Sequence, residues 1–60
     1  MVNPLREPLL TVRDVARLLR VSDKTVRRLV AGRKLRSIRV GRVLRFLPAD
    51  LFRYVEAGRE

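Results

Sequence analysis

The chain has 60 residues and a formal net charge of +9, and it contains neither cysteine nor histidine. A domain of this size buries only about 60% of the surface of its unfolded chain, so an enclosed active site is not expected. The missing residue types exclude disulfides, thiolate zinc sites and histidine-based catalysis. No uncharged run exceeds five residues, as in "PLLTV", so we expect no membrane span, no signal peptide and a cytoplasmic protein.

The positive charge is concentrated in one segment of the chain. Residues 24–45 hold nine Lys or Arg side chains and no acidic side chain, whereas the two flanks nearly neutralise themselves. A one-sided field of this kind attracts a polyanion. The alternative is that an arginine-rich composition serves solubility alone.

Prolines at positions 4 and 8 indicate an extended lead-in over residues 1–8, followed by one folded domain over residues 9–58. The segment "LTVRDVARLLR" predicts a short amphipathic helix, because Thr11 can cap its start and Asp14 completes a capping box. The apolar side of this helix consists of Val12, Val15, Ala16 and Leu19.

The same pattern recurs in "VSDKTVRRLVAG". Ser22 can cap a second helix, Asp23 suits the positive end of its dipole, and Gly32 ends it. The gap between the two helices is so short that they must pack at an angle, as in a helix-turn-helix. The buried side of the second helix consists of Val26, Leu29 and Val30. Its outward side consists of Lys24, Arg27, Arg28 and Ala31, with Thr25 on the flank.

The period then changes to that of a β-hairpin. The segments "LRSIRV" and "VLRF" alternate apolar and basic residues and are joined by Gly41 and Arg42. A two-residue turn with glycine first predicts a type II′ hairpin. The alternation places Arg39 and Arg45 together on the polar face of this hairpin.

The segment "LPADLFRYVEAG" predicts a last helix that begins at Pro48 and stops at Gly58. Its buried face consists of Leu51, Phe52 and Val55. The order of elements is therefore helix, helix, two-stranded wing, helix. This order predicts a mainly α fold with a small β-hairpin, the winged helix-turn-helix.

The second helix is predicted to read DNA, since an α-helix fits the major groove and Arg can donate two hydrogen bonds to guanine. The predicted contacts from this helix are Asp23, Lys24, Thr25, Arg27 and Arg28. Thr25 would touch a thymine methyl group. Asp23 would accept from cytosine, although its place in the first turn also explains it without DNA.

The hairpin is predicted to make the second contact, because a narrow protrusion carrying Arg can enter a minor groove or lie along phosphates. The predicted wing contacts are Arg39, Gly41, Arg42 and Arg45. The alternative is a solvated ribbon edge on which Arg discourages aggregation. The candidate phosphate contacts are Arg13, Arg17, Arg20, Ser22, Arg33 and Lys34. A solvated helix face explains the first three equally well, and Ser22 is mainly a cap.

The run "LLTVRDVARLLRVSDKTVRRLVAGRKLRSIRVGRVLRFLPADLFRYV" resembles the excisionase-type DNA-binding domain, a branch of the MerR-like winged-helix superfamily. "LLTVRDVARLL" matches the first helix, "VSDKTVRRLV" the recognition helix, "IRVGRVLRF" the wing and "PADLFRYV" the last helix. One departure is Arg20, where many members have Gly. Arg fits at this position if the first helix ends without a left-handed residue. Another departure is "VRRL", where relatives often carry Tyr.

The resemblance implies a recombination directionality factor that has no catalysis, cofactor, metal or small-molecule ligand of its own. Such proteins bind adjacent repeats in a phage attachment site, bend the double-stranded DNA and help an integrase to excise the prophage. The implied partners are therefore DNA, a phage integrase and further copies associating head to tail. Leu18 and Tyr54 could touch such a neighbour, although residues of this kind more often cover the rim of a small core.

Two alternatives remain open at this point. A small MerR-like transcriptional regulator would use the same domain on promoter repeats. A basic adaptor would bind an acidic protein or RNA, although the basic segment lacks the aromatic residues that stack on RNA bases. An enzyme is not expected, because caps, first turns and tails explain all six acidic residues and no nucleophile–base pair or Gly-rich phosphate loop appears.

Overall fold

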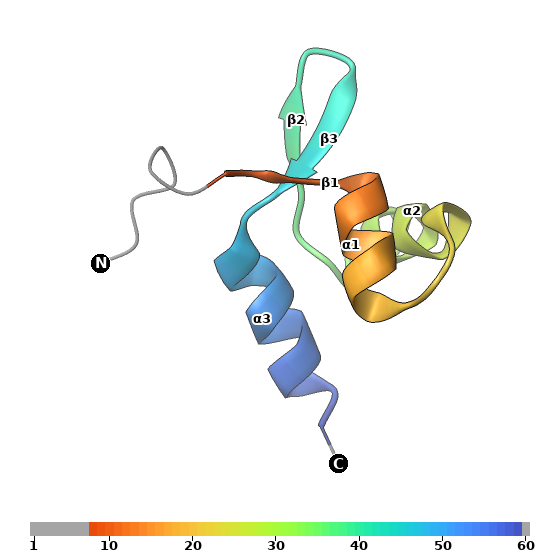
Figure 1. Ribbon diagram of the computed structural model, residues 1–60, viewed down its shortest axis with the longest axis vertical. Helices are drawn as coiled ribbons and strands as arrows, with labels where there is room; N and C mark the ends of the chain where they lie inside the picture. Colours follow the sequence, from red (N-terminus) through yellow and green to blue (C-terminus); the bar gives the residue numbers. More distant parts are fainter. Residues whose placement is uncertain (1–7, 60) are drawn as a thin grey trace.

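The computed structural model describes residues 8–59, which form three helices and a small sheet (Figure 1). The elements in chain order are β1 (Leu10–Thr11), α1 (Val12–Leu19), α2 (Asp23–Ala31), β2 (Ile38–Val40), β3 (Val43–Phe46) and α3 (Pro48–Ala57). The helices and the β2–β3 hairpin confirm the predicted mainly α winged helix-turn-helix. Residues 1–7 of the expected lead-in lie outside the described residues.

The capping box at the start of α1 is confirmed. The Thr11 backbone N–H donates to Asp14 Oδ2 at 3.0 Å, and the Asp14 backbone N–H donates to Thr11 Oγ1 at 3.0 Å. These two bonds satisfy backbone donors that the first helical turn leaves without partners. Thr11 therefore fixes the residue at which the chain changes from strand to helix.

The turn between α1 and α2 does not meet the condition stated for Arg20. Arg20 has φ 58° and ψ 46°, so α1 does end on a left-handed residue. The Arg20 N–H donates to Arg17 O at 3.2 Å, and the Val21 N–H donates to Ala16 O at 2.9 Å. This pair of bonds is the Schellman ending, which needs a left-handed residue to reverse the chain so quickly. Arg20 adopts that conformation although it is not glycine.

The ends of α2 follow the predicted pattern at Ser22 and differ from it after Gly32. Ser22 Oγ accepts from the Thr25 N–H at 3.1 Å. Gly32 ends the helix with φ −82°, and the left-handed position falls on Arg33, with φ 58°. The Lys34 N–H then donates to Leu29 O at 2.9 Å, which completes a second Schellman ending.

The hairpin turn occurs at the predicted residues. Gly41 has φ 62° and Arg42 has no positive φ, a combination that matches a type II′ turn. The structure also adds a strand that the sequence did not reveal. β1 pairs antiparallel with β3, so the sheet has the order β1-β3-β2, with Thr11 opposite Arg45. This pairing ties the wing to the start of α1.

The register of the hairpin shows that the predicted common face of Arg39 and Arg45 is wrong. Arg39 lies opposite Leu44, and Arg45 lies opposite Ile38. Residues directly opposite each other share a face of the sheet. A two-residue turn pairs odd-numbered with even-numbered positions here, so residues 39 and 45 fall on opposite faces. Arg39 is on the face of Phe46, and Arg45 is on the other.

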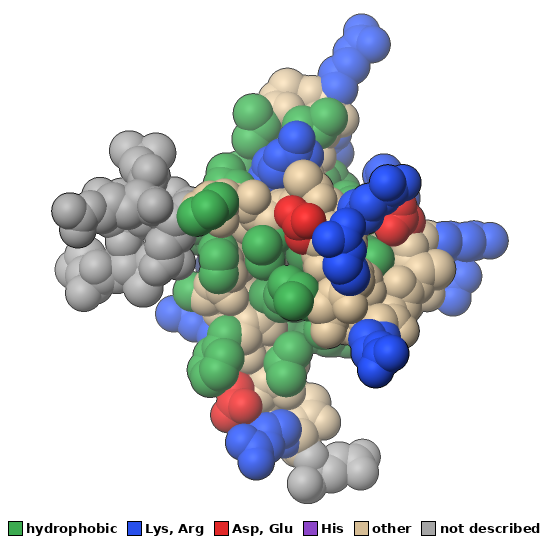
Figure 2. Space-filling model, in the orientation of Figure 1, with side chains coloured by type: hydrophobic (Ala, Val, Ile, Leu, Met, Phe, Trp, Pro, Cys, Tyr) green, Lys and Arg blue, Asp and Glu red, His purple; other side chains and the backbone are tan. Residues whose placement is uncertain are grey.

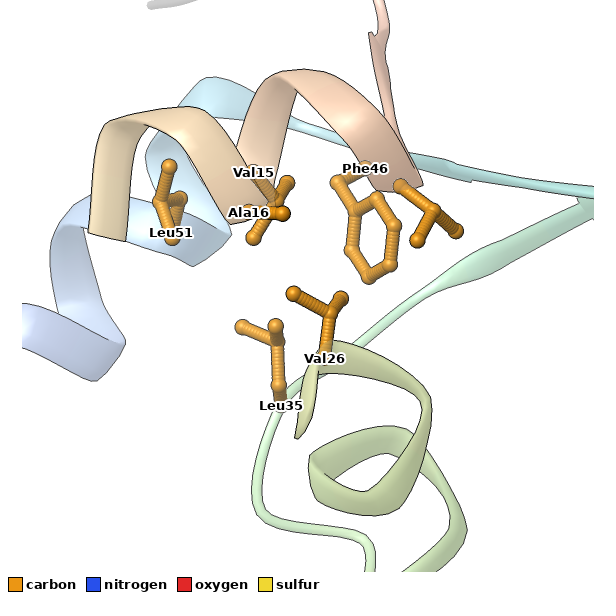
Figure 3. Close-up of a cluster of buried hydrophobic side chains, with 7 residues drawn as sticks. Val15, Ala16, Val26, Leu35, Phe46 and Leu51 are labelled. Carbon is orange, nitrogen blue, oxygen red and sulfur yellow. The ribbon is translucent and has the colours of Figure 1, made fainter. Parts of the chain in front are cut away.

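One cluster of buried side chains holds the elements together. It consists of Val12, Val15, Ala16, Val26, Leu35, Phe46 and Leu51. Figure 3 shows Val15 of α1, Val26 of α2 and Phe46 of β3 pointing toward one another, and all three have 0% exposure. The full burial of Phe46 therefore joins the sheet to the helix-turn-helix unit.

The predicted buried face of α3 is only partly correct. Leu51 joins the core and Tyr54 packs against it, but Phe52 is 65% exposed and Val55 is 44% exposed. Phe52 lies about 100° around the helix from Leu51. Val55 lies one turn further along α3, which extends away from the wing (Figure 1). No helix within residues 8–59 is long and apolar enough to cross a membrane.

Candidate nucleic-acid interface

A shallow groove lies between the wing and the starts of α1 and α2. It has a volume of about 250 Å³. Its walls consist of Thr11, Val12, Arg13, Asp23, Arg27, Arg42, Val43, Leu44 and Arg45. The fold therefore places residues from the predicted recognition helix, the predicted wing and the first helix around one surface.

Local structure at each wall fixes the shape of this groove. The capping box places Arg13 in the first turn of α1, next to Thr11. The pairing of Thr11 with Arg45 holds the base of the wing at the same point. The Ser22 cap starts α2 directly before Asp23. The three walls thus depend on the two helix caps and on the β1–β3 pairing, all of which lie close to the groove.

The groove is strongly positive. Four arginines and one aspartate line it, which gives a formal charge of +3 (4 − 1). The one ion pair found among residues 8–59 joins Arg59 and Glu56 at 3.5 Å, far along the chain from the groove residues. In Figure 2, Lys and Arg side chains project from the top of the wing and from the right-hand side, where α2 lies. This charge is available to a polyanion.

The predicted contacts from α2 divide into two groups. Asp23 and Arg27 line the groove, while Lys24 and Arg28 are exposed on α2 outside its walls. Thr25 is half-buried, and its hydroxyl lies 3.0 Å from Ser22 Oγ. Ser22 and Thr25 therefore serve the helix start, which is the structural role foreseen for Ser22.

The predicted wing contacts divide in the same way. Arg42 and Arg45 line the groove, and Gly41 forms the exposed tip beside Arg42. Arg45 is half-buried, and its Nη1 donates to Leu44 O at 2.8 Å, which orients the guanidinium at the base of the wing. Arg39 is exposed on β2 and does not line the groove.

The remaining candidate phosphate contacts lie at varied places. Arg13 is the one among them that lines the groove. Arg17 and Arg20 are exposed in and after the last turn of α1. Arg33 and Lys34 follow α2, and Lys34 lines a separate hollow against α3.

Sequence reasoning missed the less polar part of the groove, which consists of Thr11, Val12, Val43 and Leu44. Val43 is 45% exposed although it is apolar. Its place directly after the Gly41-Arg42 turn was a usable signal, since residues next to a hairpin turn lie far from the core. Thr11 and Val12 gave no such signal, because they enter the groove through a strand of only two residues.

Asp14 lies beside this groove and is held in its charged form. Its pKa is lowered mainly by the hydrogen bond from the Thr11 backbone, then by the hydrogen bond with the Thr11 side chain, with Arg17 and Arg45 adding smaller effects. Partial desolvation opposes these effects. The carboxylate that closes the capping box is therefore ionised at neutral pH.

Comparison with known proteins agrees with this geometry. The family model described as "Helix-turn-helix domain" matches residues 9–59. No curated protein and no solved structure matches the chain. The family match spans the two helices, the wing and α3, which together form and support the basic groove. The chain therefore belongs to the helix-turn-helix domain family and is a sequence-specific DNA-binding protein.

Proposed function

We propose that this protein is an excisionase, a recombination directionality factor that binds and bends DNA and directs a phage integrase towards prophage excision. The observation that carries the proposal is the compact basic groove formed by α2, the wing and the start of α1. A module of this size buries about 600–1,000 Å² on DNA, which gives modest affinity. Useful occupancy then depends on several copies on adjacent repeats or on a second protein.

The tip of the wing supports the bending part of the proposal. Val40 and Val43 face each other across the turn and are 49% and 45% exposed. Apolar side chains that enter a minor groove part neighbouring base steps and kink the duplex. With α2 in the major groove and these valines beside Arg42 in the next minor groove, binding would favour a bent site.

The partners and the location follow from the same proposal. The integrase cleaves and rejoins the DNA strands, and this protein bends the DNA without catalysing a reaction of its own. It acts in the cytoplasm of a bacterial host, at the nucleoid, with further copies associating head to tail. Leu18, which is 62% exposed on α1, supports a contact with a neighbouring copy or the integrase. Tyr54 packs against the core and does not.

A gel-shift titration on DNA from the native locus tests the proposal. The probes are the candidate attachment site and the promoter of the protein's own gene, with competitor DNA and varied salt. Stepwise, cooperative complexes confined to an attachment-site arm are expected for an excisionase. Binding confined to the promoter would establish a transcriptional regulator instead. Binding that is nonspecific and erased by salt would favour a basic adaptor.

A further inference from the structure

A second basic hollow lies between α3 and the connection from α2 to β2. It has a volume of about 310 Å³. Its walls consist of Lys34, Arg36, Asp50, Arg53, Tyr54 and Ala57. Lys34 and Arg36 come from the connection, and Arg53 comes from α3, so three cationic side chains from two segments surround one space.

This hollow is separate from the DNA groove. The two share no lining residue. In Figure 1, α2 and α3 lie on opposite sides of α1, and α3 points away from the wing. The hollow is therefore lined by other side chains than the groove, and one of them, Arg53, comes from α3. A ligand bound in this hollow would therefore be distinct from the stretch of DNA at α2.

The charge of the hollow is not neutralised from within. Three cations face one carboxylate, that of Asp50, which gives a formal charge of +2 (3 − 1). Within residues 8–59 no carboxylate lies in ion-pair range of these cations, since the ion pair found there joins Arg59 and Glu56. Asp50 is explained by its place in the first turn of α3, where the helix dipole favours a negative charge. An anion that binds in the hollow would reduce the repulsion among these like charges.

The position of this hollow also accounts for the length of the acid-free segment. Residues 24–45 carry no carboxylate, yet their basic side chains do not all face one side. Arg27, Arg42 and Arg45 line the DNA groove, whereas Lys34 and Arg36 line the hollow. The segment thus supplies positive charge to two surfaces, and α3 completes the second with Arg53.

The side chains of the hollow suit a phosphodiester. Arg36 and Arg53 carry planar guanidinium groups that can donate paired hydrogen bonds to phosphate oxygens. Lys34 adds a compact positive charge, and Tyr54 lies on the same wall and offers a hydroxyl. The hollow is shallow, which suits a phosphate on a long polymer that passes across the surface.

We propose that Lys34, Arg36 and Arg53 bind the phosphate backbone of a second DNA segment, so that one copy of the protein bridges two segments. The second segment is either a separate duplex or a distant stretch of the same molecule. The inference rests on the DNA binding of the helix-turn-helix domain and not on the excision role. It survives if the protein proves to be a promoter-binding regulator.

A two-duplex capture assay tests the proposal. One duplex is fixed to beads, a second carries a fluorophore, and capture of the second by the full chain is measured for the parent, Arg53→Gln and Arg59→Gln. The variants lose the same charge on neighbouring parts of the chain, but Arg59 pairs with Glu56 and lies outside the hollow. Circular dichroism and single-duplex binding of each variant are measured alongside.

We expect Arg53→Gln to lower capture about fivefold, the effect of losing roughly 1 kcal/mol of charge interaction. Single-duplex affinity should be kept, and Arg59→Gln should match the parent. The test is repeated on one long DNA that carries two fluorescent labels far apart, and energy transfer between the labels is measured. This second arrangement shows whether the bridged segment is a distant stretch of the same DNA and not a separate duplex. The proposal would be overturned if the parent bridged DNA in neither arrangement, or if Arg53→Gln bridged DNA as well as the parent. An acidic protein would then be the candidate ligand of the hollow. Equal loss of capture and of single-duplex binding would also overturn it, because the hollow would then belong to the first interface.

Discussion

Arg20 holds a backbone conformation that costs an L-amino acid roughly 1–2 kcal/mol relative to ordinary helix geometry. At φ 58° and ψ 46° it closes α1 and lets α2 begin three residues later. Glycine populates this region without the Cβ clash, at the expense of more entropy in the unfolded chain. The backbone of Arg20 is thus locally strained, although the rest of the turn is well capped.

We expect Arg20→Gly to raise the free energy of unfolding by about 0.5–1 kcal/mol, measured by urea denaturation. Arg17→Gly is the matched control, because it removes the same charge from within α1 and should lower the stability by about 1 kcal/mol. An Arg20→Gly protein no more stable than the parent would show that the left-handed ending is not strained.

Asp14 makes the stability of α1 depend on pH. Its folded-state pKa lies below the ordinary value of 3.8 because of its hydrogen bonds with Thr11. A lowered pKa means that the folded protein favours the carboxylate more than the unfolded chain does. The contribution of Asp14 to the free energy of unfolding is therefore complete above its pKa in the unfolded chain. It is lost as the pH falls through its pKa in the folded protein.

The pH dependence of unfolding in the parent and in Asp14→Asn checks this assignment. We expect the difference between their free energies of unfolding to be constant above about pH 5 and to shrink as the pH falls below about 4. Asparagine keeps the size of the side chain but cannot ionise, so the variant controls for packing. A difference that stays constant to pH 2 would show that the charge of Asp14 does not act on the cap.

Arg28 is exposed on the outer surface of α2, and the described residues give it no ion-pair partner. We expect Arg28→Ala to weaken binding to the cognate site by about 1–3 kcal/mol and to leave the fold intact. The measurements are fluorescence anisotropy for binding and circular dichroism for folding. Unchanged affinity in a folded variant would remove Arg28 from the DNA contacts.

At the scale of elements, the wing has two unequal faces. Arg45 lies on one face of the hairpin, whereas Arg39 lies on the other with Leu44 and Phe46. Arg42, Arg45 and Leu44 line the groove, and Arg39 does not. The hairpin therefore presents its arginines to different surroundings. We therefore expect Arg42 and Arg45, and not Arg39, to follow a DNA backbone.

The salt dependence of DNA binding distinguishes these arginines. We expect Arg42→Ala to weaken binding and to reduce the slope of log K against log salt by about one unit, the effect of one lost phosphate contact. Arg39→Ala removes the same charge outside the groove and should change the slope less. Equal slopes for the parent and Arg42→Ala would place the wing tip away from the phosphates.

Where each helix begins was predictable, because short-range hydrogen bonds decide it. Thr11 with Asp14, Ser22 with Thr25, and Pro48 each mark a helix start within a few residues. The left-handed ending at Arg20 was not predictable from residue type, since glycine is the usual signal there. A strand of two residues, β1, has too little alternation to be detected.

The surroundings of single side chains were harder to predict than the elements that carry them. The opposite faces of Arg39 and Arg45 follow from pairing across a turn, which alternation along each strand does not reveal. The exposure of Phe52 depends on which side of α3 faces the core, and Leu51 occupies that side. The groove itself joins residues up to 34 positions apart, from Thr11 to Arg45, and only the fold brings them together.

At the scale of the whole molecule, the described residues span 29 × 29 × 20 Å and present a basic groove beside α2. A duplex is about as wide as this protein, so α2 and the wing can engage neighbouring grooves of the same DNA. The central claim is that the tightest DNA site lies across α2 and the wing tip and not on α3.

Amide chemical-shift mapping of the labelled protein with a short duplex tests this claim most directly. The duplex is added at less than one equivalent, so that the tightest site fills first. The account predicts the largest shifts at residues 22–28 and 41–45 and at Arg13, with little change along residues 48–57. Largest shifts on α3, or shifts spread evenly over all basic residues, would contradict it.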